Sequence, residues 1–60
     1  MKGDHTMNTS QYIDFIVNTI KTEGWKIADN ANKIALASKR ITQAQYSKAA
    51  SLIARAFLDA

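Results

Sequence analysis

The sequence predicts a small all-α domain built from three short helices. Apolar residues recur at helical spacing over about residues 10–23, 26–38 and 43–59, and no segment shows the strict alternation that is typical of strands. The chain has 60 residues, no proline and two glycines, so little interrupts these segments. This length allows one domain, which we place at residues 9–60. We expect the helices to pack as a small bundle, which association of copies could complete.

The first predicted helix begins near residue 10 and ends at Gly24. Asn8 or Thr9 offers a polar side chain that can cap the free N–H groups of the first turn. Gly24 can take the left-handed conformation that often terminates a helix. One face of the segment collects its apolar residues, which are Tyr12, Ile13, Ile16, Val17 and Ile20. We expect this face to point into the core.

The second predicted helix covers about residues 26–38. Its expected core face consists of Ile27, Ala31, Ile34, Ala35 and Ser38. Asp29 is an alternative N-cap, which would leave residues 25–28 as an ordered linker, and we favour the longer helix. Asp29 also precedes Lys33 by four residues, a spacing that favours an ion pair on a helix surface.

The third predicted helix, about residues 43–59, has the strongest start signal. Thr42 and Gln45 have the spacing of a capping box, in which each side chain bonds the backbone N–H of the other residue. Ile41 and Tyr46 occupy the two positions of a hydrophobic staple around this cap. The expected apolar face consists of Tyr46, Ala49, Ala50, Ile53, Ala56 and Phe57.

Residues 1–8 are polar and aperiodic, which predicts a flexible tail. This tail is either vector-derived or the product of an upstream start, with Met7 as a second candidate start. The sequence has no apolar run long enough to span a membrane and no secretory-signal pattern. We therefore expect a cytoplasmic protein with no membrane partner.

Enzymatic chemistry has little support in this sequence. The acidic residues of the predicted domain are Asp14, Glu23, Asp29 and Asp59, which are scattered along the chain. There is no glycine-rich phosphate loop, and a chain this small has little room for a cleft. The absence of cysteine excludes zinc–thiolate sites, and the lone His5 cannot build a metal cage. We expect no catalysis, no cofactor, no metal and no small-molecule substrate.

Several apolar residues lie off the expected core faces and suggest a protein partner or self-association. Phe15, Leu36 and Leu52 lie outside the three faces, and Trp25 follows Gly24 directly. Clustered exposed apolar residues mark interfaces, and aromatic residues are frequent anchors there. The alternative is that these residues are ordinary exposed or doubly buried side chains and that Trp25 closes one end of the bundle. The leading interpretation is a protein–protein interaction module, with a homo-oligomer as one form of it.

Weak nucleic-acid binding is the alternative function. Eight Lys+Arg residues against five Asp+Glu give a formal net charge of +3. Spacings of seven relate Lys26, Lys33 and Arg40 on the second segment, and Lys48 and Arg55 on the third. A basic stripe is the electrostatic signature of nucleic-acid binding, although the same pattern fits a solvated helix face.

A helix-turn-helix arrangement is one form of this alternative. The second and third helices would then be the DNA-reading pair. The residues that would meet base edges are Gln43, Gln45, Ser47 and Lys48. Against this arrangement, the link at residues 39–41 has no glycine.

Part of the chain resembles a known family. The residues concerned lie between positions 12 and 46, and they are Phe15, Ile16, Gly24, Trp25, Arg40, Ile41, Thr42 and Tyr46. Their order resembles that of the small XkdX-type proteins of phages and prophages, and Ile-Thr-x-x-x-aromatic also resembles the SHOCT domains. The glycine that the pattern has before Lys/Arg-Ile-Thr is replaced here by Ser38 and Lys39. The resemblance implies a phage or mobile-element origin, but it implies no activity and carries over no functional residues.

Overall fold

The computed structural model describes residues 8–59, which form three helices and no strand. These are α1 (Thr9–Glu23), α2 (Trp25–Ala37) and α3 (Gln43–Asp59). The predicted all-α fold with three helices is confirmed. The predicted tail at residues 1–8 lies outside the described residues except for Asn8, whose side chain caps α1 by accepting from the Ser10 N–H at 2.8 Å. Helix α2 begins at Trp25 and not at Asp29, so the longer helix is the correct one.

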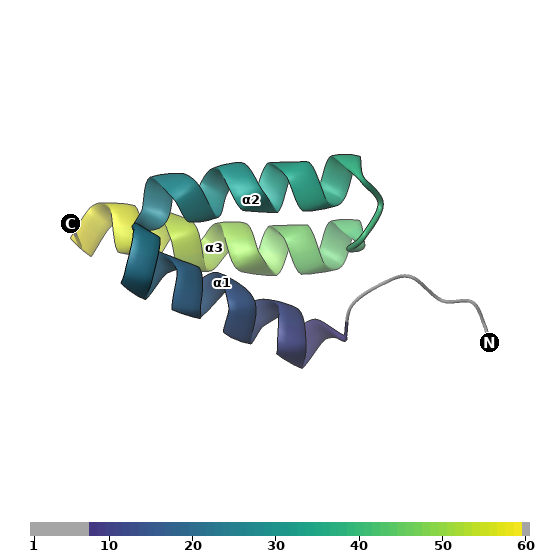
Figure 1. Ribbon diagram of the computed structural model, residues 1–60, viewed down its shortest axis with the longest axis horizontal. Helices are drawn as coiled ribbons and strands as arrows, with labels where there is room; N and C mark the ends of the chain where they lie inside the picture. The colour runs from purple at the N-terminus through teal and green to yellow at the C-terminus, as the bar shows by residue number, and fades with distance from the viewer. Residues whose placement is uncertain (1–7, 60) are drawn as a thin grey trace.

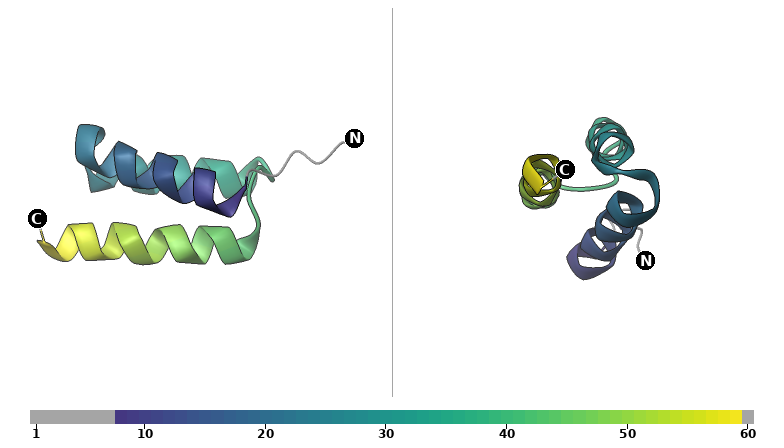
Figure 2. Two further views of the ribbon diagram at one scale, coloured as in Figure 1. Left: turned by 90° about the horizontal axis from the view of Figure 1, so that it is seen from below. Right: turned by 90° about the vertical axis from the view of Figure 1, so that its left-hand side faces the viewer.

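The three helices run up, down and up, and each packs against the other two (Figure 1). Seen end-on, they occupy the corners of a triangle, with α1 inclined to the other two (Figure 2). Helices α1 and α3 flank the antiparallel α2.

The core lies on the axis of this triangle and combines a few large side chains with alanines. Its buried members are Tyr12, Ile16, Ala28, Ala35, Ile41, Ala49 and Ile53. Alanines on the facing sides of α2 and α3 let the two helix axes approach closely. No helix in the described range 8–59 is both long and apolar enough to cross a membrane.

The inward face of α2 differs from the predicted one. Ile27 and Ile34, which we expected in the core, are 51% and 57% exposed. Ala28 and Asn32 face inward instead, beside Ala35, which was expected there, whereas Ser38 is exposed. Leu36, which we expected on the outer side, is half-buried and packs against the core. The prediction was wrong because it counted apolar residues alone and left out Asn32, whose amide oxygen and nitrogen are each hydrogen-bonded inside the bundle.

The start of α3 has the predicted capping box. The Gln45 N–H donates to Thr42 Oγ1 at 3.2 Å, and the Thr42 N–H donates to Gln45 Oε1 at 2.7 Å. Both staple residues belong to the apolar core, Ile41 as a buried member and Tyr46 as a half-buried one. Phe57, at the far end of the predicted face, is 54% exposed.

A single residue, Gly24, connects α1 to α2. Its N–H donates to the carbonyls of Thr19 and Ile20, and its own carbonyl accepts from the Ala28 N–H, so it ends one helix and begins the next. Its φ of 98° and ψ of 164° fall in a region that is almost restricted to glycine. Lys39, after α2, is the one non-glycine residue with positive φ in the described range, at 61°.

These two positions should respond to substitution in opposite directions. Gly24→Ala should lower the free energy of unfolding by about 1–3 kcal/mol, because alanine is strained at this φ and ψ. The cost is conformational, since nothing lies within 4 Å of the added Cβ. Lys39→Gly should raise the free energy of unfolding by up to about 1 kcal/mol, because it relieves a left-handed L-residue. Chemical denaturation of both variants measures the two shifts. An unchanged free energy of unfolding for Gly24→Ala would contradict the conformational cost assigned to this position.

Candidate functional site

Two hydrogen-bonded side chains cross the centre of the bundle. The Tyr12 hydroxyl on α1 donates to Asn32 Oδ1 on α2, and Asn32 Nδ2 donates to the Tyr46 carbonyl on α3 at 3.2 Å. Tyr12 is 1% exposed and Asn32 is 0% exposed. Buried amides and hydroxyls are tolerated only when paired, so these bonds both permit the burial and fix how the three helices meet.

Ionisation of Tyr12 should couple this contact to pH. Burial raises the pKa of the Tyr12 hydroxyl above its ordinary value of 10.0. The pKa of Tyr12 is therefore higher in the folded state than in the unfolded state. Its hydroxyl contributes fully to the free energy of unfolding below pH about 10, and this contribution is lost as the pH rises from there through the folded-state pKa. Urea unfolding between pH 8 and about 11 should show this decline. Tyr12→Phe should be less stable at pH 8 but should decline less steeply, and equal slopes would contradict the assignment.

A second polar contact joins the starts of α1 and α3. Gln45 Nε2 donates to Thr9 Oγ1 at 3.0 Å, while Gln45 also forms the capping box with Thr42. Gln45 is only 6% exposed. Its side chain is therefore committed to the fold, which removes one of the four residues that a helix-turn-helix arrangement would need at base edges.

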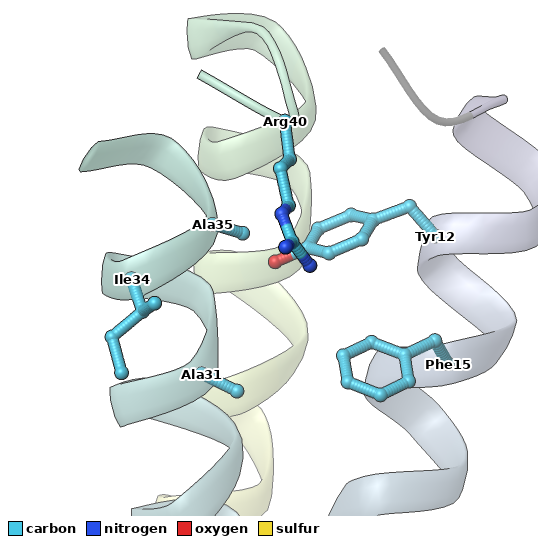
Figure 3. A pocket seen from close by; sticks show the side chains of 6 residues that line it. All are labelled: Tyr12, Phe15, Ala31, Ile34, Ala35 and Arg40. Carbon is cyan, nitrogen blue, oxygen red and sulfur yellow. The ribbon is translucent and has the colours of Figure 1, made fainter. Parts of the chain in front are cut away.

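The candidate site is a groove of about 430 Å3 between α1 and α2, which we call the α1–α2 groove. Figure 3 looks into it, with α3 behind. Its lining residues are Tyr12, Phe15, Ala31, Ile34, Ala35 and Arg40. The small side chains of Ala31 and Ala35 lie between the larger groups, so a ligand could approach the α2 backbone closely.

Large apolar side chains at this groove remain in contact with solvent. Phe15 is 47% exposed although its ring lies 6.0 Å from the Tyr12 ring, and it points from α1 toward α2 (Figure 3). Ile34 is 57% exposed on the opposite wall. Ile27 lies seven residues before Ile34, on the same side of α2, and is similarly exposed. The unpartnered apolar surface thus extends along most of α2.

Arg40 is the one charged residue at the α1–α2 groove. Its side chain extends from the connection after α2 and is seen in front of the Tyr12 ring (Figure 3). Within residues 8–59 its guanidinium has no carboxylate partner, since the ion pair found there joins Lys33 Nζ to Asp29 Oδ2 at 3.2 Å. That pair is the one expected from the sequence.

A second, shallower hollow of about 310 Å3 lies on the other side of α2, against α3. Its lining residues are Trp25, Asp29, Ala50, Ile53, Ala54 and Phe57. The Trp25 and Phe57 rings meet edge to face with centroids 4.8 Å apart. Trp25 is half-buried and packs against the core, so it closes this end of the bundle.

The structure does not bring the four predicted partner-binding residues together. Phe15 lines the α1–α2 groove, and Trp25 lies in the hollow between α2 and α3. Leu36 lies on the same side of α2 as Trp25 and Asp29, which is the side that faces α3. It is half-buried there. Leu52 is half-buried and lies on the same side of α3 as Gln45, whose side chain reaches Thr9 of α1.

The predicted basic residues are all exposed, but they lie along three separate edges. Lys26 and Lys33 lie on the side of α2 that carries Trp25 and Asp29. Arg40 lies on the opposite side, at the α1–α2 groove. Lys48 and Arg55 lie beside Leu52 on α3, on its α1 side. A spacing of seven keeps residues aligned on one helix but does not align two helices with each other.

Sequence reasoning missed most of the α1–α2 groove. Ile34 and Ala31 were assigned to the core together with Ala35, of which only Ala35 is buried there, and Arg40 was considered only as a nucleic-acid contact. A usable signal existed in Tyr12 and Asn32, because a tyrosine on an apolar face implies a buried polar partner. A prediction that paired Tyr12 with Asn32 would have placed Asn32 on the inner side of α2 and Ile27 and Ile34 on the outer side.

Comparisons with models of known protein families, with curated proteins and with solved structures gave no match. In the described part of the chain no three His, Cys, Asp or Glu residues are grouped so that they could hold a metal ion.

Proposed function

We propose that this protein is a small non-catalytic binding module and that its partner surface is the α1–α2 groove. The observation that carries the proposal is the exposure of Phe15 and Ile34 at the two sides of one groove, with Ala31 and Ala35 between them (Figure 3). A core this small has few large apolar residues to spare, so leaving two of them in solvent at one place indicates an interface. No acidic residue or histidine lines this groove, which supports binding over general acid–base chemistry.

Protein binding is favoured over nucleic-acid binding by the distribution of charge. A phosphate backbone is bound by several cations that follow one surface. Here Lys26 and Lys33, Arg40, and Lys48 and Arg55 lie along three edges, and Lys33 is already paired with Asp29. The α1–α2 groove contributes only one cation, beside an apolar lining.

The relationship to XkdX-type proteins is part of the proposal, as are a phage or mobile-element origin and a cytoplasmic location. One observation supports it. Lys39 stands next to Arg40, Ile41 and Thr42, where that family's pattern has glycine, and it takes the left-handed φ of 61° that glycine favours. Such helix ends also occur in unrelated proteins.

Selection of peptides from a random displayed library on the immobilised protein tests the proposed function. The double variant Phe15→Ser, Ile34→Ser should lose affinity for the selected peptides by at least about tenfold, because apolar anchors dominate such interfaces. Each serine should lower the free energy of unfolding by no more than about 1 kcal/mol, since both side chains are about half exposed.

The matched control is Leu58→Ser, which removes a 79% exposed apolar residue at the end of α3, outside the groove. It should leave peptide affinity unchanged. The proposal fails if selection yields no peptides above background, or if the selected peptides bind the double variant as tightly as the natural sequence.

A further inference from the structure

We infer that the occupant of the α1–α2 groove is a short amphipathic helix of another protein, with a carboxylate that pairs with Arg40. This inference rests on the proposed function and adds the chemistry of the partner. Three features of the groove lead to it: its walls and floor, its length, and the single unpaired charge at one end.

The shape of the groove fits a helix. Two packed helices already form its walls, and Ala31 and Ala35 form a floor of small residues, so the backbone of a further helix can approach closely. The described residues contain no sheet edge that an extended peptide could join. A helix in this position would complete a four-helix arrangement, with α3 on one side of the α1–α2 pair and the partner on the other.

The length of the apolar strip sets the length of the partner. Ile27, Ala31 and Ile34 lie along one side of α2, and the helix continues to Ala37. The seven residue steps from Ile27 to Ile34, at about 1.5 Å each, give roughly 10 Å, or about two turns. A partner helix would therefore present apolar residues at positions i, i+3 or i+4, and i+7 toward Phe15 and Ile34.

The charge of the groove predicts the sign of the partner's charge and the end of the groove at which that charge lies. Arg40 lies at the end of the groove marked by Tyr12, whereas Phe15 and Ala31 lie farther along it (Figure 3). Its guanidinium has no carboxylate partner among the described residues. A carboxylate near one end of the partner would pair with it, and the net charge of +3 on the whole chain would attract an acidic segment.

Other occupants fit less well. A small-molecule site usually combines an apolar pocket with several convergent polar groups, but the Tyr12 hydroxyl already donates to Asn32 and only Arg40 remains. A second copy of the chain would bring the same net positive charge of +3, which opposes association. An acidic helix from a different protein is the occupant that satisfies both the apolar lining and Arg40.

The test is to select helical peptides from a displayed library on the natural protein and, separately, on Arg40→Glu. Peptides selected on the natural protein should carry apolar residues at helical spacing and Asp or Glu at one end. Synthesised copies should bind Arg40→Glu at least about fivefold more weakly, and replacing the acidic residue with lysine should reverse this preference.

Arg55→Glu is the matched control, because it makes the same charge change at an exposed site outside the groove. Its peptide affinity should stay within about twofold at moderate salt, where distant surface charges are screened. Circular dichroism of all three proteins checks that helicity is retained.

The remaining outcomes each overturn a defined part of the inference. Peptides that need Phe15 and Ile34 but show no acidic preference would overturn the pairing with Arg40 and leave the proposed function standing. Peptides without helical spacing would overturn the helical occupant. Sedimentation that shows a dimer abolished by Ile34→Ser would place a second copy in the groove. An absence of any groove-dependent peptide would overturn the proposed function itself.

Discussion

Asn32→Asp should unfold the domain at neutral pH. Asn32 is 0% exposed, and its amide joins the Tyr12 hydroxyl to the Tyr46 carbonyl. Aspartate would place an uncompensated charge there, at a cost of several kcal/mol. A folded region of about 50 residues is expected to have a free energy of unfolding of only about 3–8 kcal/mol. Far-UV circular dichroism at pH 7 should therefore show a large loss of helix.

Two controls separate burial of the charge from loss of the amide as such. Asn30→Asp makes the same change at an exposed position two residues earlier and should leave the helicity intact. Acid should partly restore Asn32→Asp, because a buried carboxyl has a raised pKa and its neutral form can bond both neighbours. With the folded-state pKa above the unfolded value, stability is complete below pH about 4 and is lost as the pH rises. A helical Asn32→Asp protein at pH 7 would show that Asn32 is not part of a buried contact.

Ile16→Ala should lower the free energy of unfolding by about 2–5 kcal/mol. Ile16 is 0% exposed at the centre of the core, and the surrounding helices can fill the resulting cavity only in part. For a domain of this size, the loss approaches the whole stability. Urea denaturation monitored by circular dichroism gives the free energy directly.

Ile27→Ala is the matched control for this prediction. It removes the same atoms from a side chain that is 51% exposed, so the free energy of unfolding should change by no more than about 0.5 kcal/mol. The comparison also tests the orientation of α2, because the sequence pattern placed Ile27 in the core. A cost at Ile27 equal to that at Ile16 would support the pattern over the structure.

The helix boundaries could be predicted closely because local signals determine them. The capping box at Thr42 and Gln45, the glycine at position 24 and the polar cap at Asn8 all act within a few residues. Such contacts depend on spacing along the chain and need no knowledge of the tertiary structure. The apolar faces of α1 and α3 were also largely right, because helical spacing alone places Tyr12 and Ile16 on one face of α1 and Ala49 and Ile53 on one face of α3.

The orientation of α2 could not be predicted because it depends on a long-range polar contact. Isoleucine is more hydrophobic than alanine, so counting apolar residues turns Ile27 and Ile34 inward. In the structure, the bond between Tyr12 and Asn32 turns Asn32 and Ala28 inward, with Ala35 beside them as predicted. The candidate site follows from this rotation, since Ile34 stays exposed and lines one groove with Phe15 of α1 only once α2 is placed against α1.

The partner-binding residues illustrate the same limit. Phe15 was identified correctly as lying outside the core face of its helix, because that conclusion requires only one helix. Leu36 was expected outside but packs against the core, because its surroundings depend on how two helices meet. Whether residues on different helices form one surface is a tertiary question that spacing along the chain does not answer.

The central claim is that the α1–α2 groove is the binding surface of this protein. The most direct measurement is the map of amide chemical-shift changes when the tightest selected peptide is added to the 15N-labelled protein. We predict that the changes centre on Phe15, Ala31, Ile34 and Arg40 and spare Lys48 and Arg55. Changes centred instead on the hollow at Trp25 and Phe57, or on the basic edge of α3, would contradict the claim.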